Sequence, residues 1–148
     1  MTLDLEIQRA TSVMPLPDDE QFRVWASTAL QGRKAAELTV RLVDREESRQ
    51  LNARFRGKDS ATNVLSFPAE LPGEVDLPLL GDVVICAPLV NEEAGQQGKT
   101  PEAHWAHLTI HGILHLLGFD HQDEKQATEM EALEIRMLAA VKISNPYQ

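Results

Sequence analysis

Residues 101 to 117 constrain the fold more than any other part of the chain. Thr100 and Pro101 fit the cap and the first position of a helix, and the following residues continue in a helical pattern. At about 100° per residue, apolar side chains cover most of the circumference, which is typical of a buried helix. A narrow stripe on one side carries four of the five histidines of the chain, namely His104, His107, His111 and His115. We therefore expect other elements to pack around this helix and to leave a cleft along its histidine stripe.

The end of the predicted helix has the spacing of a metal site. His111 and His115 are four residues apart, so both imidazoles face one point in space. Gly118 can adopt the left-handed conformation that ends a helix, and His121 follows soon after. The sequence thus predicts that His111, His115 and His121 bind one divalent metal ion, for which zinc is the best match to three imidazoles. Three protein ligands leave a position open, as in catalytic sites.

Three further residues lie close to the predicted ligands in the sequence. His107 lies one turn before the first predicted ligand, and we expect it to line the cleft or to support a ligand. His104 is expected to be exposed near the start of the helix. Asp120 orients an imidazole through its carboxylate, accepts a proton from the metal-bound water, or caps a tight turn. A single histidine on an apolar helix is usually a core residue, so only the combined spacing favours a metal.

The same spacing occurs in the metzincin proteases, whose pattern is H-E-x-x-H-x-x-G-x-x-H. The glutamate of that pattern is the general base, and this chain has Gly112 in its place. Glycine has no side chain that could accept a proton, so the metal ligands would be kept and the peptidase base lost. A metallopeptidase or another metallohydrolase is therefore the weaker alternative.

Two separate motifs stand out, H-G-I-L-H-L-L-G-F-D-H at residues 111 to 121 and R-G-K-D-S-A-T-N-V-L-S-F-P at residues 56 to 68. Together they resemble the signatures of the YbeY family of bacterial endoribonucleases, which are metal-dependent rRNA maturation factors. Phe119 stands where many members of that family have tyrosine. The resemblance covers the whole chain, which we expect to be one domain, residues 1 to 148. It implies a single-strand-selective endoribonuclease in small-subunit rRNA maturation and ribosome quality control.

The resemblance also suggests roles for residues of the second motif. Arg56 is the candidate catalytic residue, because its planar guanidinium matches phosphate oxygens and could stabilise a pentavalent transition state. Its alternative role is to complement the dipole at a helix C-terminus. Lys58 and Asn63 are candidates for binding the substrate backbone. RNA and the ribosome or its proteins are the expected partners, and neither DNA nor a membrane is expected. A non-enzymatic ribosome-assembly factor with a structural metal is a further alternative.

The charge distribution bears on an RNA ligand. A net charge of -9 taken alone argues against a polyanion, but ten of the fourteen Lys and Arg lie in residues 1 to 58. Six of these lie between Arg41 and Lys58 against three acids, which indicates either a phosphate-binding patch or a solvated helix face with ion pairs. The few aromatic residues give little sign of a base-stacking platform. The N-terminus lacks the pattern of a signal peptide, and no apolar run could span a bilayer, so cytoplasmic residence is expected.

The rest of the sequence predicts a compact α/β (α+β) domain with a small mixed four-stranded sheet packed against about five helices. Alternating apolar residues predict strands at residues 3–9, 38–42, 62–67 and 82–86, with Cys86 buried. Helical spacing and capping residues predict helices at residues 18–32, 44–56, 88–97, 101–117 and 123–141. In the last helix we expect Met130 and Leu138 to face the core and Glu129, Glu131 and Glu134 to face water.

Overall fold

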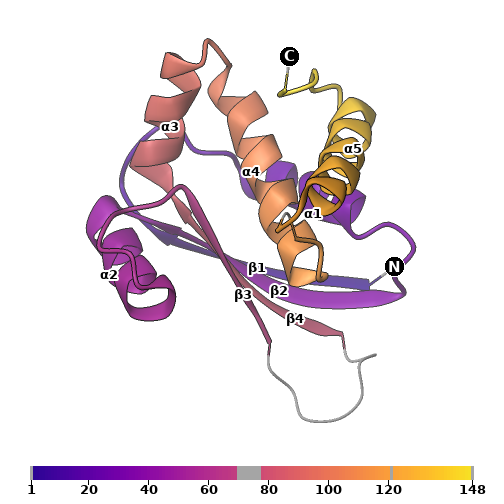
Figure 1. Ribbon diagram of the computed structural model, residues 1–148, viewed down its shortest axis with the longest axis horizontal. Coiled ribbons are helices and arrows are strands. Elements are labelled where there is room, and N and C mark those ends of the chain that lie inside the picture. The colour runs from indigo at the N-terminus through magenta and orange to yellow at the C-terminus, as the bar shows by residue number, and fades with distance from the viewer. Residues whose placement is uncertain (1, 70–77, 121, 148) are drawn as a thin grey trace.

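The computed structural model describes residues 2–69, 78–120 and 122–147, and in them a four-stranded mixed sheet is covered by helices (Figure 1). The strands are β1 (Thr2–Ala10), β2 (Ala35–Val43), β3 (Val64–Pro68) and β4 (Leu79–Cys86). Their order in the sheet is β1-β2-β4-β3, so β3 forms an edge. Neighbours pair in parallel except β3, which is antiparallel to β4. The predicted architecture is confirmed, and Cys86 is buried as expected.

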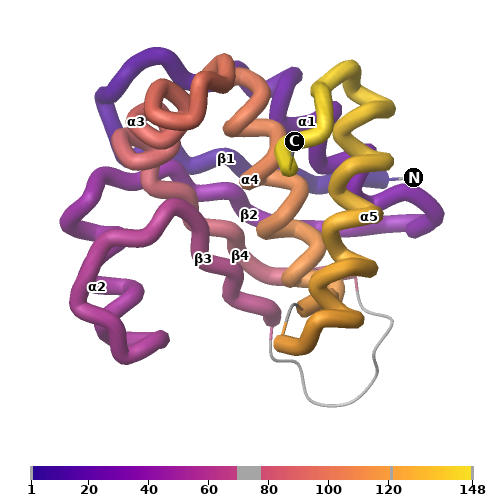
Figure 2. Tube along the Cα trace, turned by 45° about the horizontal axis from the view of Figure 1, so that its top comes forward, coloured from indigo at the N-terminus to yellow at the C-terminus, as the bar shows by residue number. Residues whose placement is uncertain are grey.

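The helices are α1 (Asp19–Ala29), α2 (Arg45–Arg56), α3 (Ala87–Gln96), α4 (Pro101–Leu116) and α5 (Glu124–Ala140). Helix α4 lies centrally, between α3 on one side and α5 on the other, while α2 lies apart from this group, beyond β3 (Figures 1 and 2). The predicted helices are confirmed, with ends that differ by a few residues. None of the helices in the described ranges is long and apolar enough to cross a membrane.

The two faces of the sheet carry apolar clusters of different size, and alternate side chains of β4 belong to one or the other. Val83 and Ile85 belong to the main core, which they share with the apolar residues of α1, α3, α4 and α5. Val84 points to the other face, where it meets a small cluster that includes Leu51 of α2 and Phe67 of β3. Because side chains alternate across a strand, α4 and α2 pack on opposite faces of the sheet.

The ends of α4 follow from its sequence. The Thr100 hydroxyl accepts a hydrogen bond from the Ala103 amide at 3.1 Å and so caps the first turn. At the other end, Gly118 adopts a left-handed backbone with φ of 99°, as predicted. The C-terminal end of α4 thus brings His111 and His115 to the cleft described below. Residue His121 lies outside the described residues, so its predicted role as a metal ligand stays a prediction.

Helix α4 approaches the sheet closely at Gly112. A β-carbon at this position would lie 2.6 Å from Cγ1 of Val83 and 3.2 Å from Cγ2 of Val64. The hydroxyl of Ser66 on β3 donates a 2.7 Å hydrogen bond to the Gly112 carbonyl across the same contact. Position 112 therefore faces the sheet and has no space for the glutamate of the metzincin pattern.

This close contact predicts the effect of Gly112→Ala. The added methyl group meets the fully buried Val83, and overpacking of this kind costs about 1–3 kcal/mol. The gain in helix propensity is about 1 kcal/mol, so we expect a net loss of stability of about 1 kcal/mol. The free energy of unfolding, measured by urea denaturation, tests this. Gly95→Ala in α3 is the control, because its β-carbon would meet nothing within 4 Å, and it should stabilise the protein. A Gly112→Ala variant as stable as the wild type would contradict the prediction.

Candidate metal centre and adjoining cleft

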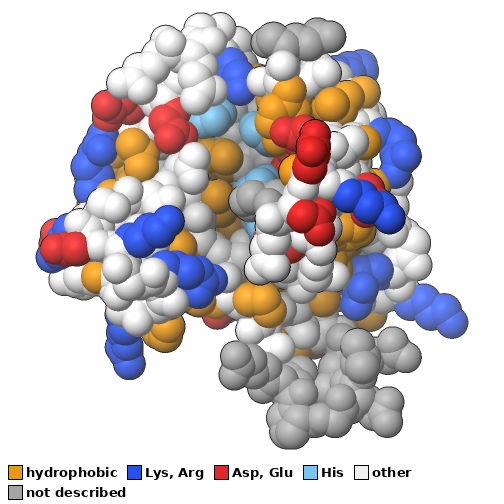
Figure 3. Space-filling model, in the orientation of Figure 1, with side chains coloured by type: hydrophobic (Ala, Val, Ile, Leu, Met, Phe, Trp, Pro, Cys, Tyr) orange, Lys and Arg blue, Asp and Glu red, His pale blue; other side chains and the backbone are white. Residues whose placement is uncertain are grey.

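A cleft of about 520 Å³ lies where the end of α4 meets β3 and the end of α2. Figure 3 shows histidine side chains in a hollow, with Lys and Arg on the side of α2 and acidic side chains on the side of α5. The two sequence motifs thus meet in space. The cleft is lined by Arg56, Asn63, Val64, Leu65, Ser66, Pro68, His111, His115, Gly118, Phe119 and Asp120.

His111 and His115 turn their imidazoles toward each other, as their spacing predicts. Their Nε2 atoms are 3.1 Å apart. Two nitrogens that bind one tetrahedral metal at 2.0–2.1 Å are about 3.3 Å apart, so the pair is close to the geometry of a shared ion. Both side chains are half-buried and line the cleft. The chemistry and the arrangement of these two donors fit a divalent metal.

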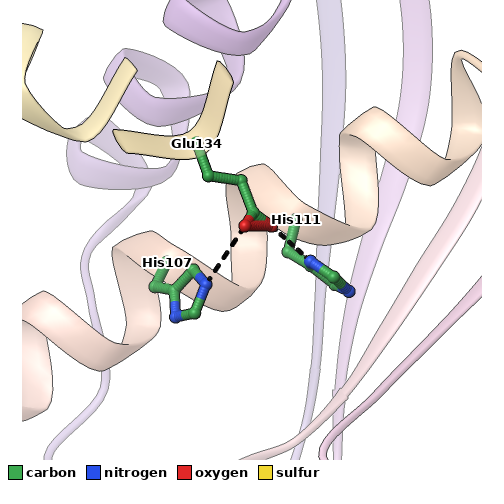
Figure 4. Close-up of side chains that lie close together, drawn as sticks. All are labelled: His107, His111 and Glu134. Atoms are coloured by element: carbon green, nitrogen blue, oxygen red, sulfur yellow. Dashed lines mark hydrogen bonds and ion pairs between the residues drawn. The ribbon is translucent and has the colours of Figure 1, made fainter. Parts of the chain in front are cut away.

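Glu134 of α5 lies directly behind this pair, contrary to the prediction that it faces water. The side chain is fully buried, and its Oε1 is hydrogen-bonded to Nδ1 of His111 (Figure 4). The sequence carried a signal for this position: Glu134 lies four residues after Met130 and four before Leu138, which are both buried. It therefore belongs to the core stripe of α5, and a charged residue there needs buried partners.

The second carboxylate oxygen of Glu134 also has partners. The Tyr147 hydroxyl donates to Oε2, and Nε2 of His107 lies 3.5 Å from it. Burial alone would raise the pKa of Glu134, but hydrogen bonds from His107, His111 and Tyr147 lower it to about 2. Burial and the contact with Glu134 raise the pKa of Tyr147, so the phenol keeps its proton. Glu134 is thus a carboxylate in a closed hydrogen-bond network.

The described residues contain a second group that could hold a metal. His107, His111 and Glu134 each offer one ligand atom within 4.8 Å of the others. In this arrangement His111 would use Nδ1, whereas in the pair with His115 it uses Nε2. Glu134 is fully buried and His107 is not among the cleft residues, so only the pair of His111 and His115 opens to the cleft.

Arg56 lines the cleft across from the histidines. It is the last residue of α2, its Nη2 donates a 2.8 Å hydrogen bond to the Ser66 carbonyl, and its guanidinium lies 5.3 Å from the centre of the Phe67 ring. These contacts hold the side chain on β3. Gly57 follows with a left-handed φ of 71° and ends the helix.

The basic patch predicted between residues 41 and 58 divides into two halves. Arg41 pairs with Glu47, Arg45 with Glu92, and Arg49 with both Glu46 and Asp59, so the ion-pair interpretation is correct for these three arginines. No ion pair of Arg54, Arg56 or Lys58 is found within the described parts of the chain. The cations available to a phosphate therefore gather at the C-terminal end of α2.

Of the other predicted site residues, Asn63 and Asp120 line the cleft and Lys58 does not. Asn63 lines the cleft, and its amide nitrogen donates to Glu93 of α3 at 3.1 Å. Asp120 lines the cleft beside Phe119. Lys58 is exposed and is not among the cleft-lining residues. A role in binding the substrate stays a prediction for Lys58 and Asn63.

His104 is buried, so the prediction that it is exposed is wrong. Its side chain is covered because α3 packs against the first turns of α4, and its Nε2 lies 2.9 Å from Oε1 of Glu93. Burial lowers the pKa of His104, and Glu93 opposes this effect. Its Nδ1 has no hydrogen-bond partner among the described residues. Protonation would place an N–H there without an acceptor, so the folded protein favours the neutral ring.

Comparison with known proteins gives one consistent result. The family model described as endoribonuclease YbeY matches residues 7–142. An endoribonuclease YbeY from Pseudomonas fluorescens is 58% identical over 147 residues, which is 98% of this chain and 96% of that protein. The solution structure of TM1509 from Thermotoga maritima has a TM-score of 0.58 and 23% sequence identity, and covers 97% of this chain and 99% of that one. This structural similarity supports the fold alone.

The buried His104 predicts a specific pH dependence of stability. Because its pKa is lowered in the folded state, the unfolded state binds the proton more tightly. Stability should be complete above the ordinary histidine pKa of about 6.5 and should fall as the pH drops below it. The largest slope from one proton is about 1.4 kcal/mol per pH unit.

The free energy of unfolding between pH 5 and 8, measured with a chelator present, tests this dependence against a His104→Gln variant. Glutamine keeps a donor for Glu93 but does not titrate, so the variant should lose less stability on acidification than the wild type. Lys99 and His107 also act on the His104 ring, and both remain in the variant. Parallel curves for the two proteins would exclude His104 as the source.

Proposed function

Because the chain belongs to the endoribonuclease YbeY family, we propose that this protein is a metal-dependent endoribonuclease that cleaves single-stranded RNA. The observation that supports this proposal best is that His111, His115 and Arg56 line one cleft. This arrangement places metal-binding imidazoles and a guanidinium on facing walls. It suits a phosphodiester, which carries negative charge and develops more negative charge in the transition state.

In this proposal one zinc ion is bound by Nε2 of His111 and His115 together with His121. The arrangement favours the Nε2 pair over the group of His107, His111 and Glu134, since only the pair opens to the cleft. Glu134 then has the role of the carboxylate that commonly lies behind a metal-binding histidine. By accepting the Nδ1 proton of His111, it fixes the tautomer in which Nε2 carries the lone pair that can bind a metal.

The bound metal would supply Lewis acidity toward a phosphoryl oxygen or a water molecule. Arg56 would bind the non-bridging phosphate oxygens and stabilise the charge that develops on them. Its bond to the Ser66 carbonyl and its contact with Phe67 hold the guanidinium in place before the substrate arrives, which reduces the cost of ordering it. Asp120 would orient His121, and Lys58 and Asn63 would contact the substrate backbone.

The proposed substrate is the rRNA of the small ribosomal subunit, processed during maturation and quality control in the cytoplasm, with the ribosome or its proteins as partners. The peptidase alternative is disfavoured by Gly112, where the close approach to Val83 leaves no space for a general base.

Cleavage of a labelled single-stranded RNA by protein of known zinc content tests the proposal. Arg56→Ala should lower kcat by about 10²–10³, the effect of removing one donor to a developing oxyanion. His115→Ala should abolish activity together with zinc binding. Arg136→Ala, an exposed arginine on α5, is the control and should keep full activity. Cleavage that is unchanged in folded Arg56→Ala and His115→Ala variants would show that the activity is a contaminant.

Zinc affinity tests the arrangement of the ligands, with Glu134→Gln compared with the wild type. Removal of the carboxylate behind His111 should weaken zinc binding by about 10- to 100-fold, as measured by competition with a chromophoric chelator. Glu129→Gln, the same change at an exposed site of α5, should have no effect. If His115→Ala bound zinc as tightly as the wild type while His107→Ala lost zinc affinity, the ion would instead lie between His107, His111 and Glu134.

A further inference from the structure

Two phenylalanines form an exposed aromatic surface at the end of α2. Phe55 is 49% exposed, although an aromatic ring gains more by burial, and it packs edge-on against the partly buried Phe67 of β3 at 5.3 Å between ring centres. The aromatic content of the sequence did not predict such a surface, because the two rings are brought together only by the fold. Exposed apolar rings with a polar rim commonly mark a binding site.

An arginine guanidinium lies over each of the two rings. The guanidinium of Arg54 lies 5.1 Å from the centre of the Phe55 ring, and that of Arg56 lies 5.3 Å from the centre of the Phe67 ring. We call these four residues, Phe55, Phe67, Arg54 and Arg56, the aromatic–arginine platform. Neither arginine has an ion pair in the part of the chain that the structure describes, so both charges are available to a phosphate.

A depression of about 460 Å³ lies beside the platform, on the face of the sheet that carries α2. Leu51 and Val84 give it an apolar lining, and Gln8, Thr39 and Asp82 add polar groups. Arg41 and Glu47 also line it, and their charges neutralise each other in an ion pair. Asp82 disfavours a phosphate inside the depression, whereas a base with amino groups is compatible with it. The acidic depression therefore suits a base, and the two arginines beside it suit the phosphate of the same nucleotide.

The platform adjoins the proposed catalytic cleft through Arg56 and β3. Arg56 lines the cleft and also covers the Phe67 ring. Along β3, Ser66 and Pro68 line the cleft while Phe67 between them lines the depression, because alternate side chains point to opposite sides of a strand. Since β3 is an edge of the sheet, a nucleotide chain can pass over it from one hollow to the other.

We propose that the aromatic–arginine platform binds one unpaired base of the RNA substrate, stacked on Phe55, next to the phosphate held by Arg56. This inference rests on the proposed function and adds a subsite to it. An unpaired base is required because bases in a duplex are already stacked on each other, so the platform would contribute to selectivity for single strands.

Binding of a single-stranded oligoribonucleotide, measured by fluorescence anisotropy with every protein also carrying His115→Ala so that the RNA is not cleaved, tests the platform. Phe55→Ala should weaken binding by about 5- to 150-fold, the usual effect of losing one stacked base. Phe55→Tyr keeps the ring and should bind like the wild type. Val24→Ala, which shortens an exposed apolar side chain on α1, is the control. A denaturing gel after each titration shows that the RNA is still intact.

Two further measurements separate stacking from charge. The first uses a series of oligonucleotides, each of which lacks the base at one position. The missing base that weakens binding to the wild type should not weaken binding to Phe55→Ala, because removing the base and removing the ring eliminate the same contact. Arg54→Ala should reduce the slope of log affinity against log salt by about 0.7, the value for one phosphate of a single strand. Phe55→Ala should leave this slope unchanged.

The outcomes distinguish the platform from the proposed function. Wild-type protein that cleaves RNA, together with Phe55→Ala that binds it equally well, would overturn the platform and leave the nuclease proposal intact. If the wild-type protein did not cleave RNA but bound it in a way that depends on Phe55, the platform would be supported and the nuclease proposal overturned. A Phe55→Ala variant with unchanged RNA affinity but altered elution in size-exclusion chromatography would overturn the platform and assign the rings to a contact between copies of the chain.

Discussion

The buried hydrogen bond between Glu134 and His111 is the interaction on which the arrangement of the site depends. A carboxylate without solvent contact is costly unless it is bound, and here His111, His107 and Tyr147 together satisfy it. This need joins α5 and the C-terminal residues to α4. It also fixes which nitrogen of His111 faces His115, so a core constraint determines the chemistry available in the cleft.

The other wall of the cleft depends on how closely α4 approaches the sheet. Gly112 allows the helix backbone to contact Val64 and Val83, and the Ser66 hydroxyl bonds to the carbonyl at that point. The same strand positions Arg56 through the Ser66 carbonyl. Ser66 therefore connects both walls, with its side chain bound to the histidine helix and its backbone to the arginine. This double attachment explains why two motifs distant in the sequence form one site.

Local sequence patterns predicted what depends on local spacing. The strands, the helices, the left-handed Gly118 and the facing pair of His111 and His115 all follow from periodicity and capping. The same patterns predict the surroundings of His104 and Glu134 wrongly, because both resemble exposed polar positions while other helices cover them. Tertiary packing also brings Phe55 to Phe67 and Tyr147 to Glu134. Only the position of Glu134 between Met130 and Leu138 gave a local signal.

In the proposed site, the metal lies on the cleft side of the His111 ring and Glu134 lies behind the ring. A crystal structure of the zinc-loaded protein, with the ion located by its anomalous scattering, tests it directly. We expect one zinc ion within about 2.0–2.1 Å of Nε2 of both His111 and His115, and Glu134 hydrogen-bonded to Nδ1 of His111. An ion bound to a Glu134 oxygen and Nδ1 of His111, with His115 uninvolved, would contradict it.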